Sequence, residues 1–226
     1  MPDAKDESGY ELFNTHHGGP MLVIFGGVAM GFVLPPFEFR SFIESLSVTT
    51  LLVRDTSQAW YQRGVAGLGD DIPSAAAALR GHVVSHTPSR LVLMGNSAGG
   101  FAAMRFGLEL ADIVDAVIAF SPQTCLRARW RTSHRDRRWE PQVTAAQLLV
   151  GRESDELDAA RWQDPWPPVD LHFALGNRLD MSHALHVART GRIRLRPHVS
   201  RSHRLVAELR DKARLSDLVR ERLEPS

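Results

Sequence analysis

The 226-residue sequence predicts an α/β fold with a doubly wound, mainly parallel sheet. Short apolar runs that suit buried strands alternate with segments of helical spacing, and the connections between them are short. The length favours a single domain over residues 1–226. Hydrophobic residues make up 43% of the chain and charged residues 23%, a balance typical of folded globular proteins rather than disordered ones.

The first half of the pattern begins with two strands. Residues 21–25 form an apolar run that ends at two glycines, and residues 48–53 form a β-branched run. Between them, residues 37–46 are expected to be helical. A second helix is expected after Asp71, where apolar side chains recur at helical spacing and Pro73 lies in the tolerated first turn.

The second half continues the alternation. Residues 90–94 predict a strand that leads directly into a glycine-rich turn and a helix of small residues ending near Leu110. A final helix, spaced to bury one side, is expected from about His203 to Leu223. Further strands are expected at residues 116–120, 170–175 and 193–197.

One stretch, residues 122–168, interrupts this rhythm. It holds no convincing strand, four of the five tryptophans and an arginine-dense run, LRARWRTSHRDRRW. Long insertions of this kind are functional lids or disordered segments, and the tryptophans argue against disorder. We therefore expect a helical lid here.

Charge and cysteine content narrow the classes of function. The 27 basic and 26 acidic residues give no excess of positive charge for a nucleic-acid partner. The single cysteine, Cys125, allows neither an internal disulfide nor a cysteine-based zinc site. The N-terminal residues lack the apolar core of a secretory signal, and no apolar stretch is long enough to span a membrane. We expect a cytoplasmic protein with no membrane or nucleic-acid partner.

The strongest motif is Gly95-Asn96-Ser97-Ala98-Gly99, which lies between a predicted strand and a predicted helix. The spacing G-x-S-x-G is that of a nucleophile elbow, in which glycines let strand and helix approach while a strained turn presents the serine. At a helix N-terminus, backbone N–H groups favour developing negative charge. Ser97 is therefore the candidate nucleophile, and an N-cap serine is the plainer interpretation.

On this motif and its setting, the chain resembles the α/β-hydrolase superfamily over roughly residues 20–223. In that family the catalytic triad follows the order Ser, Asp or Glu, His, with the acid after a late strand and the histidine after the last one. The resemblance implies Asp180 as the acid and His203 as the base. Too few residues precede Met21 for the family's opening strand pair, so we expect reduced N-terminal strands.

Other residues compete for these roles. Asp55, which follows an earlier strand, is the alternative acid, and an ordinary helix cap is the plainer interpretation of Asp180. His198, within the last expected strand, and His183, in the helix after Asp180, are the alternative bases.

The resemblance also implies an oxyanion hole. One N–H would come from Ala98 and another from Gly27 or Val28, in the loop after the first strand. This loop departs from the family's HGGG form because no histidine precedes its glycines. The similar-looking His17-Gly18-Gly19 lies before the strand, and we do not assign it to the site.

Cofactor chemistry is disfavoured. The glycines after residue 25 lack the G-x-G-x-x-G spacing, and the chain has no phosphate-binding P-loop motif. Asp180, His183 and His186 would fan out around a helix, a poorer metal arrangement than an i, i+4 histidine pair. We expect no metal and no cofactor.

Substrate contacts are expected from two places. Trp60 and Tyr61 follow the end of a strand, and Trp130, Arg135 and Arg138 lie in the insertion. Arginines and tryptophans together suit an anionic substrate group, although a solvated basic face over a tryptophan core explains them equally.

These inferences predict a serine hydrolase that cleaves an ester or thioester through an acyl-serine intermediate, with a small-molecule or carrier-bound acyl substrate. An acyltransferase with the same triad is one alternative. A non-catalytic binding or scaffold protein of the same fold is another.

Overall fold

A seven-stranded sheet lies at the centre of the computed structural model, which describes residues 8–15, 17–28, 42–163, 165–190 and 192–224. The strand order is β1-β3-β2-β4-β5-β6-β7, and every neighbouring pair is parallel except β1 with β3. The mainly parallel sheet predicted from the sequence is confirmed. Its strands are β1 (Tyr10–Phe13), β2 (Pro20–Phe25), β3 (Thr49–Val53), β4 (Arg90–Asn96), β5 (Ala116–Phe120), β6 (Val169–Ala174) and β7 (Ile193–His198).

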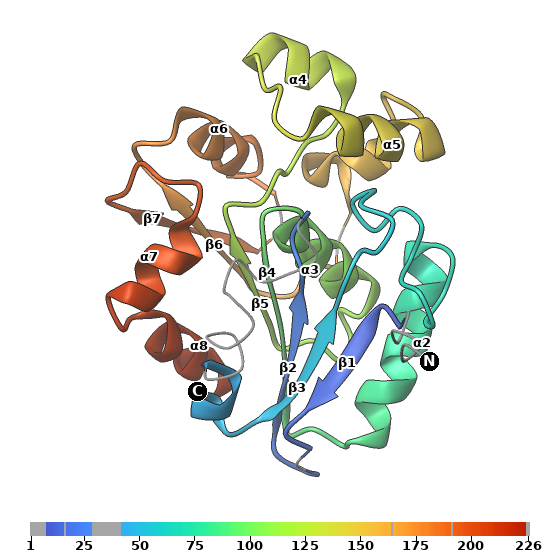
Figure 1. The fold of residues 1–226 in the computed structure, drawn as a ribbon, viewed down its shortest axis with the longest axis vertical. Helices are drawn as coiled ribbons and strands as arrows, with labels where there is room; N and C mark the ends of the chain where they lie inside the picture. The colour runs from blue at the N-terminus through green and yellow to red at the C-terminus, as the bar shows by residue number, and fades with distance from the viewer. Residues whose placement is uncertain (1–7, 16, 29–41, 164, 191, 225–226) are drawn as a thin grey trace, which may run out of the picture.

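Helices cover both faces of this sheet (Figure 1). One face packs against α2 (Ile72–Ser85) and α3 (Ala98–Glu109), and the other against α7 (Leu205–Asp211), α8 (Leu215–Leu223) and the helical residues 42–46. Strand β2 contributes side chains to the hydrophobic core on each face of the sheet. Val23 belongs to the cluster with α2 and α3, whereas Leu22 and Ile24 belong to the cluster with α7 and α8. Successive side chains of a strand point to opposite faces, which is why the central strands are apolar throughout.

The connections reverse direction at the carboxyl ends of the central strands. From β2 the chain crosses to β3 on one side and then returns to β4 on the other. Such a reversal of strand order marks the usual ligand site of open α/β sheets. The loops after β2 and β4 meet at this edge, and they carry Gly27 and Ser97.

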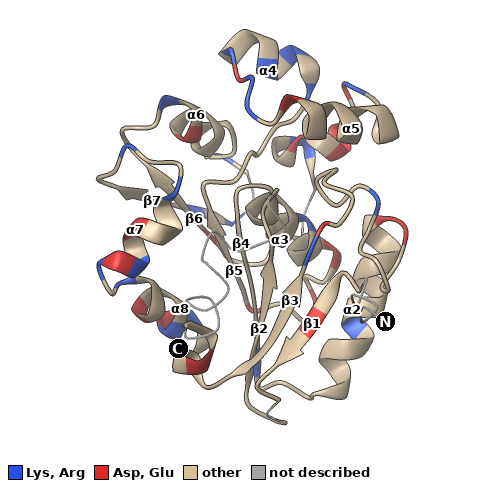
Figure 2. Ribbon diagram, viewed as in Figure 1, with Lys and Arg blue, Asp and Glu red and all other residues tan. Residues whose placement is uncertain are grey.

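The insertion at residues 122–168 lies beyond the same edge of the sheet (Figure 1). It forms α4 (Ala128–His134), α5 (Glu140–Val150) and two 3₁₀ turns, η1 (Asp155–Leu157) and η2 (Ala159–Arg161). Trp162 packs against Phe101 of α3 at a ring separation of 4.9 Å and stacks with Trp166. Figure 2 shows basic residues along α4 and the loop that follows it.

Two elements differ from the sequence-based expectation. Strand β1 was not predicted; it pairs antiparallel with β3 and is the single named strand before β2 among the described residues. The single final helix that we expected is two helices, α7 and α8. The first of them ends in a tight turn at Ala213, whose φ is 54°. There the Arg214 N–H donates to the carbonyl of Leu209 at 2.8 Å, as in a Schellman motif. Residues 37–41 of the helix expected at 37–46, and residues 29–36 before it, lie outside the described residues. Residues 42–46 are helical.

Candidate active site

Ser97 occupies the sharp turn between β4 and α3, with φ 56° and ψ −119°. A residue with a side chain rarely adopts this conformation, so the surrounding structure must hold it. The Ser97 N–H donates to the carbonyl of Phe120 on the neighbouring strand at 2.8 Å. The strained turn expected for Ser97 is therefore present and is tied to the sheet.

Gly95 and Gly99 flank this serine at points where two backbone segments touch. A Cβ on Gly95 would lie 2.0 Å from the carbonyl oxygen of Gly99, and a Cβ on Gly99 would lie 2.0 Å from that of Phe25. Non-bonded atoms do not approach this closely, so glycine alone fits both positions without moving the backbone. The glycine spacing around Ser97 is thus a packing requirement of the turn.

Ser97, His203 and Asp180 form one chain of hydrogen bonds. The Nε2 atom of His203 lies 3.1 Å from Ser97 Oγ, and its Nδ1 lies 2.8 Å from Asp180 Oδ1. His203 follows β7 and precedes α7, while Asp180 lies in the first turn of α6 (Arg178–His186). This is the geometry in which an acid orients a histidine and the histidine accepts the proton of a serine.

The surroundings of Asp180 favour its ionised form. Burial opposes ionisation, but hydrogen bonds from His203 and Arg138 outweigh it and lower the pKa of Asp180. Arg138 donates from Nη1 to Asp180 Oδ1 at 2.8 Å, the same oxygen that faces His203. The acid is therefore held as a carboxylate by two partners from different parts of the chain.

The alternative acid and bases lie elsewhere. Asp55 Oδ2 accepts the backbone N–H of Tyr61 at 2.9 Å, which makes Asp55 a support for the loop after β3. His198 faces His172 at 2.9 Å. His183 is buried against Asp136, with 3.0 Å between Nε2 and Oδ2. The structure thus places Asp180 and His203, rather than these residues, next to Ser97.

Gln123 is a contact of the serine that the sequence did not reveal. It is buried at the start of the insertion, with Oε1 3.0 Å from Ser97 Oγ and Nε2 3.5 Å from His203 Nε2. The serine hydroxyl has one hydrogen and therefore donates to either Gln123 or His203 at a time. A 180° rotation of the amide would turn Gln123 into a donor to Oγ and leave the serine hydrogen for His203.

The expected oxyanion-hole residues lie at the same edge. Ala98 is the first residue of α3, where N–H groups have no partner within the helix. The Gly26 N–H donates to the carbonyl of Val53 at 2.8 Å, so Gly27 and Val28 are the next N–H groups of the loop after β2. Their assignment to the oxyanion remains a prediction.

Trp60 and Tyr61 do not have the substrate-lining position that we expected. Both side chains are fully buried at 0% exposure, within the core that packs on α2 and α3. The Tyr61 hydroxyl lies 2.9 Å from the carbonyl oxygen of Gly26, and burial raises its pKa well above the ordinary value. The Tyr61 hydroxyl therefore contacts the backbone of the loop after β2, while its ring is enclosed in the core.

Within the insertion, Arg138 and Trp130 are also committed to protein partners. Arg138 holds the buried Asp136 with Nη2 2.8 Å from Oδ2, in addition to its bond to Asp180. Trp130 stacks on His134 at 4.0 Å, and its Nε1–H donates to His186 Nδ1 at 3.1 Å. The guanidinium of Arg138 thus links two buried carboxylates, and the expectation that it binds a substrate anion stays a prediction. Arg135 is exposed and lines a cavity of the insertion, so its role stays a prediction.

Cys125, Asp158 and His186 are the one group among the described residues whose ligand atoms lie close enough together to hold a metal. Their hydrogen bonds already join these side chains to one another and to protein partners. Because Trp130 donates to His186 Nδ1, the ring hydrogen belongs on Nε2, which points at Asp158 Oδ1 2.6 Å away. Burial, followed by the nearby Asp158, raises the pKa of the Cys125 thiol to about 12, so the thiol keeps its proton.

Asp136 and Gln123 carried no signal in the sequence. Asp136 is a lone acid within an arginine-rich run, a pattern more typical of a solvated surface than of a buried carboxylate. Gln123 follows the end of β5 without any motif. Both acquire their roles from the fold, which brings residues 26 to 80 positions apart within hydrogen-bonding distance.

Comparison with solved structures identifies the fold. The chain superimposes on an esterase from the archaeon Pyrobaculum calidifontis (TM-score 0.61, 16% identity, covering 94% of this chain and 80% of that one). It also matches mouse alpha/beta hydrolase domain-containing protein 10 (0.58, 13%, 94% and 93%) and an S-formylglutathione hydrolase from Agrobacterium tumefaciens (0.60, 15%, 95% and 90%). No protein-family model and no curated protein sequence matches the chain. The chain has the α/β-hydrolase fold.

The helices in the described ranges include none that combines the length and apolar character needed to cross a membrane.

Proposed function

We propose that the protein is a serine hydrolase that cleaves an ester or thioester through an acyl-serine intermediate. The observation that carries this proposal is the chain of hydrogen bonds from Ser97 through His203 to Asp180, which begins at the strained turn before α3. The fold is shared with an esterase and with an S-formylglutathione hydrolase, which adds support for ester or thioester cleavage.

In the first half of the reaction, Ser97 Oγ attacks the substrate carbonyl carbon while His203 Nε2 takes the hydroxyl proton. The carbonyl oxygen gains negative charge and accepts hydrogen bonds from the N–H of Ala98 and from that of Gly27 or Val28. As the tetrahedral intermediate collapses, the bond to the leaving oxygen or sulfur breaks. That atom receives the proton from His203 and departs as an alcohol or thiol.

In the second half, a water molecule attacks the acyl carbon and gives a proton to His203. The bond to Ser97 Oγ then breaks, and His203 returns the proton to the serine, which releases the carboxylic acid. Throughout, Asp180 remains a carboxylate and stabilises the imidazolium, because its lowered pKa keeps it ionised near neutral pH.

The insertion at residues 122–168 acts in this proposal as a lid that selects the substrate. Two of its residues contact the triad directly: Gln123 faces Ser97 and Arg138 binds Asp180. Ser97 itself is only 5% exposed, which is consistent with a covered nucleophile. A lid with direct contacts to the nucleophile and the acid would define both the access route and the shape of the site.

A fluorophosphonate probe tests the nucleophile, and a panel of acyl esters and thioesters tests the reaction. We expect the wild-type protein to be labelled and Ser97→Ala to lose labelling, with a fall in kcat on the order of 10⁶. Ser85→Ala, at an exposed serine in the last turn of α2, is the matched control and should label like the wild type.

The outcome separates the three classes of function. Labelling that survives Ser97→Ala excludes this serine as the nucleophile. A protein that binds acyl compounds without labelling or turnover is a binding or scaffold member of the fold. Labelling with slow hydrolysis that accelerates on addition of an alcohol or amine, with a transfer product, identifies an acyltransferase.

A further inference from the structure

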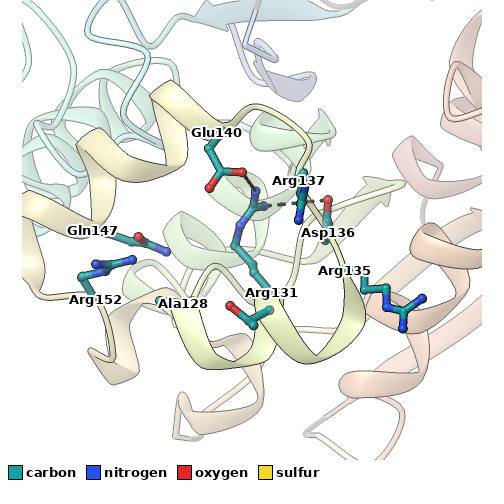
Figure 3. A pocket seen from close by; sticks show the side chains of 9 residues that line it. Ala128, Arg131, Arg135, Asp136, Arg137, Glu140, Gln147 and Arg152 are labelled. Carbon is teal, nitrogen blue, oxygen red and sulfur yellow. Dashed lines mark ion pairs between the residues drawn. The ribbon is translucent and has the colours of Figure 1, made fainter.

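The insertion contains a cavity between α4 and α5, and no residue of the triad lines it. Its volume is about 170 Å³, several times the roughly 30 Å³ of one water in the liquid. Four arginines and two carboxylates line it, so positive charge exceeds negative charge by two. They are Arg131, Arg135, Arg137, Arg152, Asp136 and Glu140 (Figure 3).

Arg131 is the buried donor of this cavity. Its side chain is 6% exposed, and Nη2 donates to the carbonyl of Arg138 at 2.8 Å. Its Nη1 has no hydrogen-bond partner among the described residues. Burial lowers the pKa of Arg131, in keeping with a cation that lacks full compensation. A buried guanidinium with an unused N–H group is costly unless an acceptor approaches it.

The two carboxylates of the cavity do not supply that acceptor. Asp136 Oδ1 lies 3.9 Å from Arg131 Nη1, and both Asp136 oxygens already accept bonds from Arg138, with His183 on Oδ2 as well. Glu140 Oε2 lies 3.8 Å from Arg131 Nη2, and the Glu140 side chain is largely in solvent. Both distances exceed hydrogen-bonding range, so the charge of Arg131 is only partly balanced.

We propose that this cavity binds a phosphate-class oxyanion. Arg131 provides the buried N–H donor, while Arg137 and Arg152 also line the cavity and lie on opposite sides of Arg131 in the view of Figure 3. A tetrahedral dianion has enough oxygens to accept from three guanidinium groups, and its negative charge suits a cavity lined by more arginines than carboxylates. A single carboxylate would leave part of that charge and part of the donor set unused.

The site is also linked to the triad through the protein. Asp136 forms part of the cavity wall and binds Arg138, whose Nη1 in turn donates to Asp180. The oxyanion has two possible sources: a phosphate carried by the leaving group of the substrate, or free phosphate. The first source rests on the proposed hydrolase function, whereas binding itself does not.

Calorimetric titration with inorganic phosphate and with pyrophosphate, at fixed ionic strength, tests binding without any need for catalysis. We expect saturable single-site binding that weakens at least tenfold in the double variant Arg137→Gln/Arg152→Gln. The control double variant Arg129→Gln/Arg161→Gln removes the same charge from two exposed arginines outside the cavity and should bind like the wild type. Arg131→Met should abolish binding. If this variant fails to fold, the comparison of the two double variants still tests the proposal.

Two results would overturn the proposal: no saturable binding of either anion, or equal weakening in the two double variants. The source of the phosphate follows from kinetics with two thioesters that share an acyl group but differ in whether the leaving group bears phosphate. A KM for the phosphate-bearing thioester that rises selectively in Arg137→Gln/Arg152→Gln identifies a substrate phosphate. Binding without that selectivity identifies free phosphate. If the wild-type protein hydrolysed neither thioester, the proposed function would be refuted. The calorimetric result on anion binding would still stand.

Discussion

Replacing Arg138 with methionine keeps much of the side chain's length but removes the guanidinium that joins Asp136 to Asp180. In the native protein, Arg138 Nη2 and Nη1 lie 2.8 Å from Asp136 Oδ2 and 2.8 Å from Asp180 Oδ1. The side chain of Asp136 is 0% exposed and that of Asp180 is 1% exposed. The substitution therefore leaves two buried carboxylates with one fewer cation.

The size of the effect follows from that burial. Removing one partner of a buried ion pair costs about 3–5 kcal/mol of unfolding free energy, because the remaining charge loses its compensation. Arg138 itself is 20% exposed, and Asp136 and Asp180 keep histidine partners, so the lower end applies, about 3 kcal/mol. For a protein of this size the expected fall in Tm is roughly 6–12 °C.

The loss should also depend on pH. Burial opposes ionisation of Asp136, but hydrogen bonds from His183 and Arg138 hold its pKa far below the ordinary range, and the pKa of Asp180 is lowered as well. A carboxylate with a lowered pKa contributes stability above its unfolded pKa of about 4, and loses it as pH falls towards the folded pKa. The difference between wild type and Arg138→Met should therefore be largest at neutral pH and shrink below about pH 4.

Chemical denaturation at pH 7 and in steps down to pH 3 measures this difference. Arg129→Met, at an exposed arginine of α4, is the matched control and should stay within about 0.5 kcal/mol of the wild type. Adding Asp136→Leu to Arg138→Met should recover part of the loss, since it removes an uncompensated buried charge. An Arg138→Met variant as stable at pH 7 as the control would refute the reasoning.

Three further predictions concern the site and its frame. Asp180→Asn should lower kcat on the order of 10⁴-fold in steady-state assays, whereas Asp55→Asn should mainly lower Tm; a larger kcat loss from Asp55→Asn would reverse the assignment. Gly99→Ala should yield little folded protein, because its Cβ would meet backbone at 2.0 Å. Gly81→Ala, with nothing within 4 Å, should raise the free energy of unfolding by up to about 1 kcal/mol, and a normal yield of Gly99→Ala would contradict this packing. Cys125, buried with a pKa of about 12, should react with a thiol reagent only in denaturant; rapid labelling of the native protein would show that its thiol is accessible.

The central strands and the serine turn could be predicted because their signals are local. Apolar runs define β2 to β6, and the glycine spacing around Ser97 is a motif that five consecutive residues display, although the backbone that excludes a Cβ at Gly99 comes from Phe25 on β2. Strand β1 gave no such signal, since it is a four-residue edge strand whose middle residues are exposed. Its pairing with β3 depends on a partner about 40 positions away, which a local pattern does not report.

The charged residues show the limit more sharply. An arginine-rich run looks the same in the sequence whether its side chains contact solvent, a ligand or a buried acid. Arg138 reaches Asp180 across 42 positions, and only the packing of the insertion on the sheet makes that contact possible. Arg135, three positions earlier, is exposed. The contacts of Arg138 with two acids could not be predicted, because the fold, rather than the local sequence, decides which arginine is enclosed.

Among the described residues, three Asp–His pairs lie in or against the insertion and α6, and the proposed chemistry needs only one of them. Asp180 pairs with His203, Asp136 with His183 and Asp158 with His186, at 2.8, 3.0 and 2.6 Å. Each acid also has an arginine within 4 Å, so charge compensation does not distinguish the three pairs.

What distinguishes them is the group opposite the second ring nitrogen. His203 Nε2 faces the hydroxyl of Ser97, which a strained turn holds at the edge of the sheet. His183 Nδ1 lies 3.4 Å from the hydroxyl of Thr124, but that hydroxyl donates to the backbone carbonyl of His183 at 2.8 Å. Burial lowers the pKa of His183 to about 4, and the ring is 1% exposed, so no substrate carbonyl reaches this pair. His186 accepts from an indole N–H, which is no nucleophile. A hydroxyl that can donate its proton to the second ring nitrogen, rather than the Asp–His pair itself, therefore confines the proposed chemistry to Ser97.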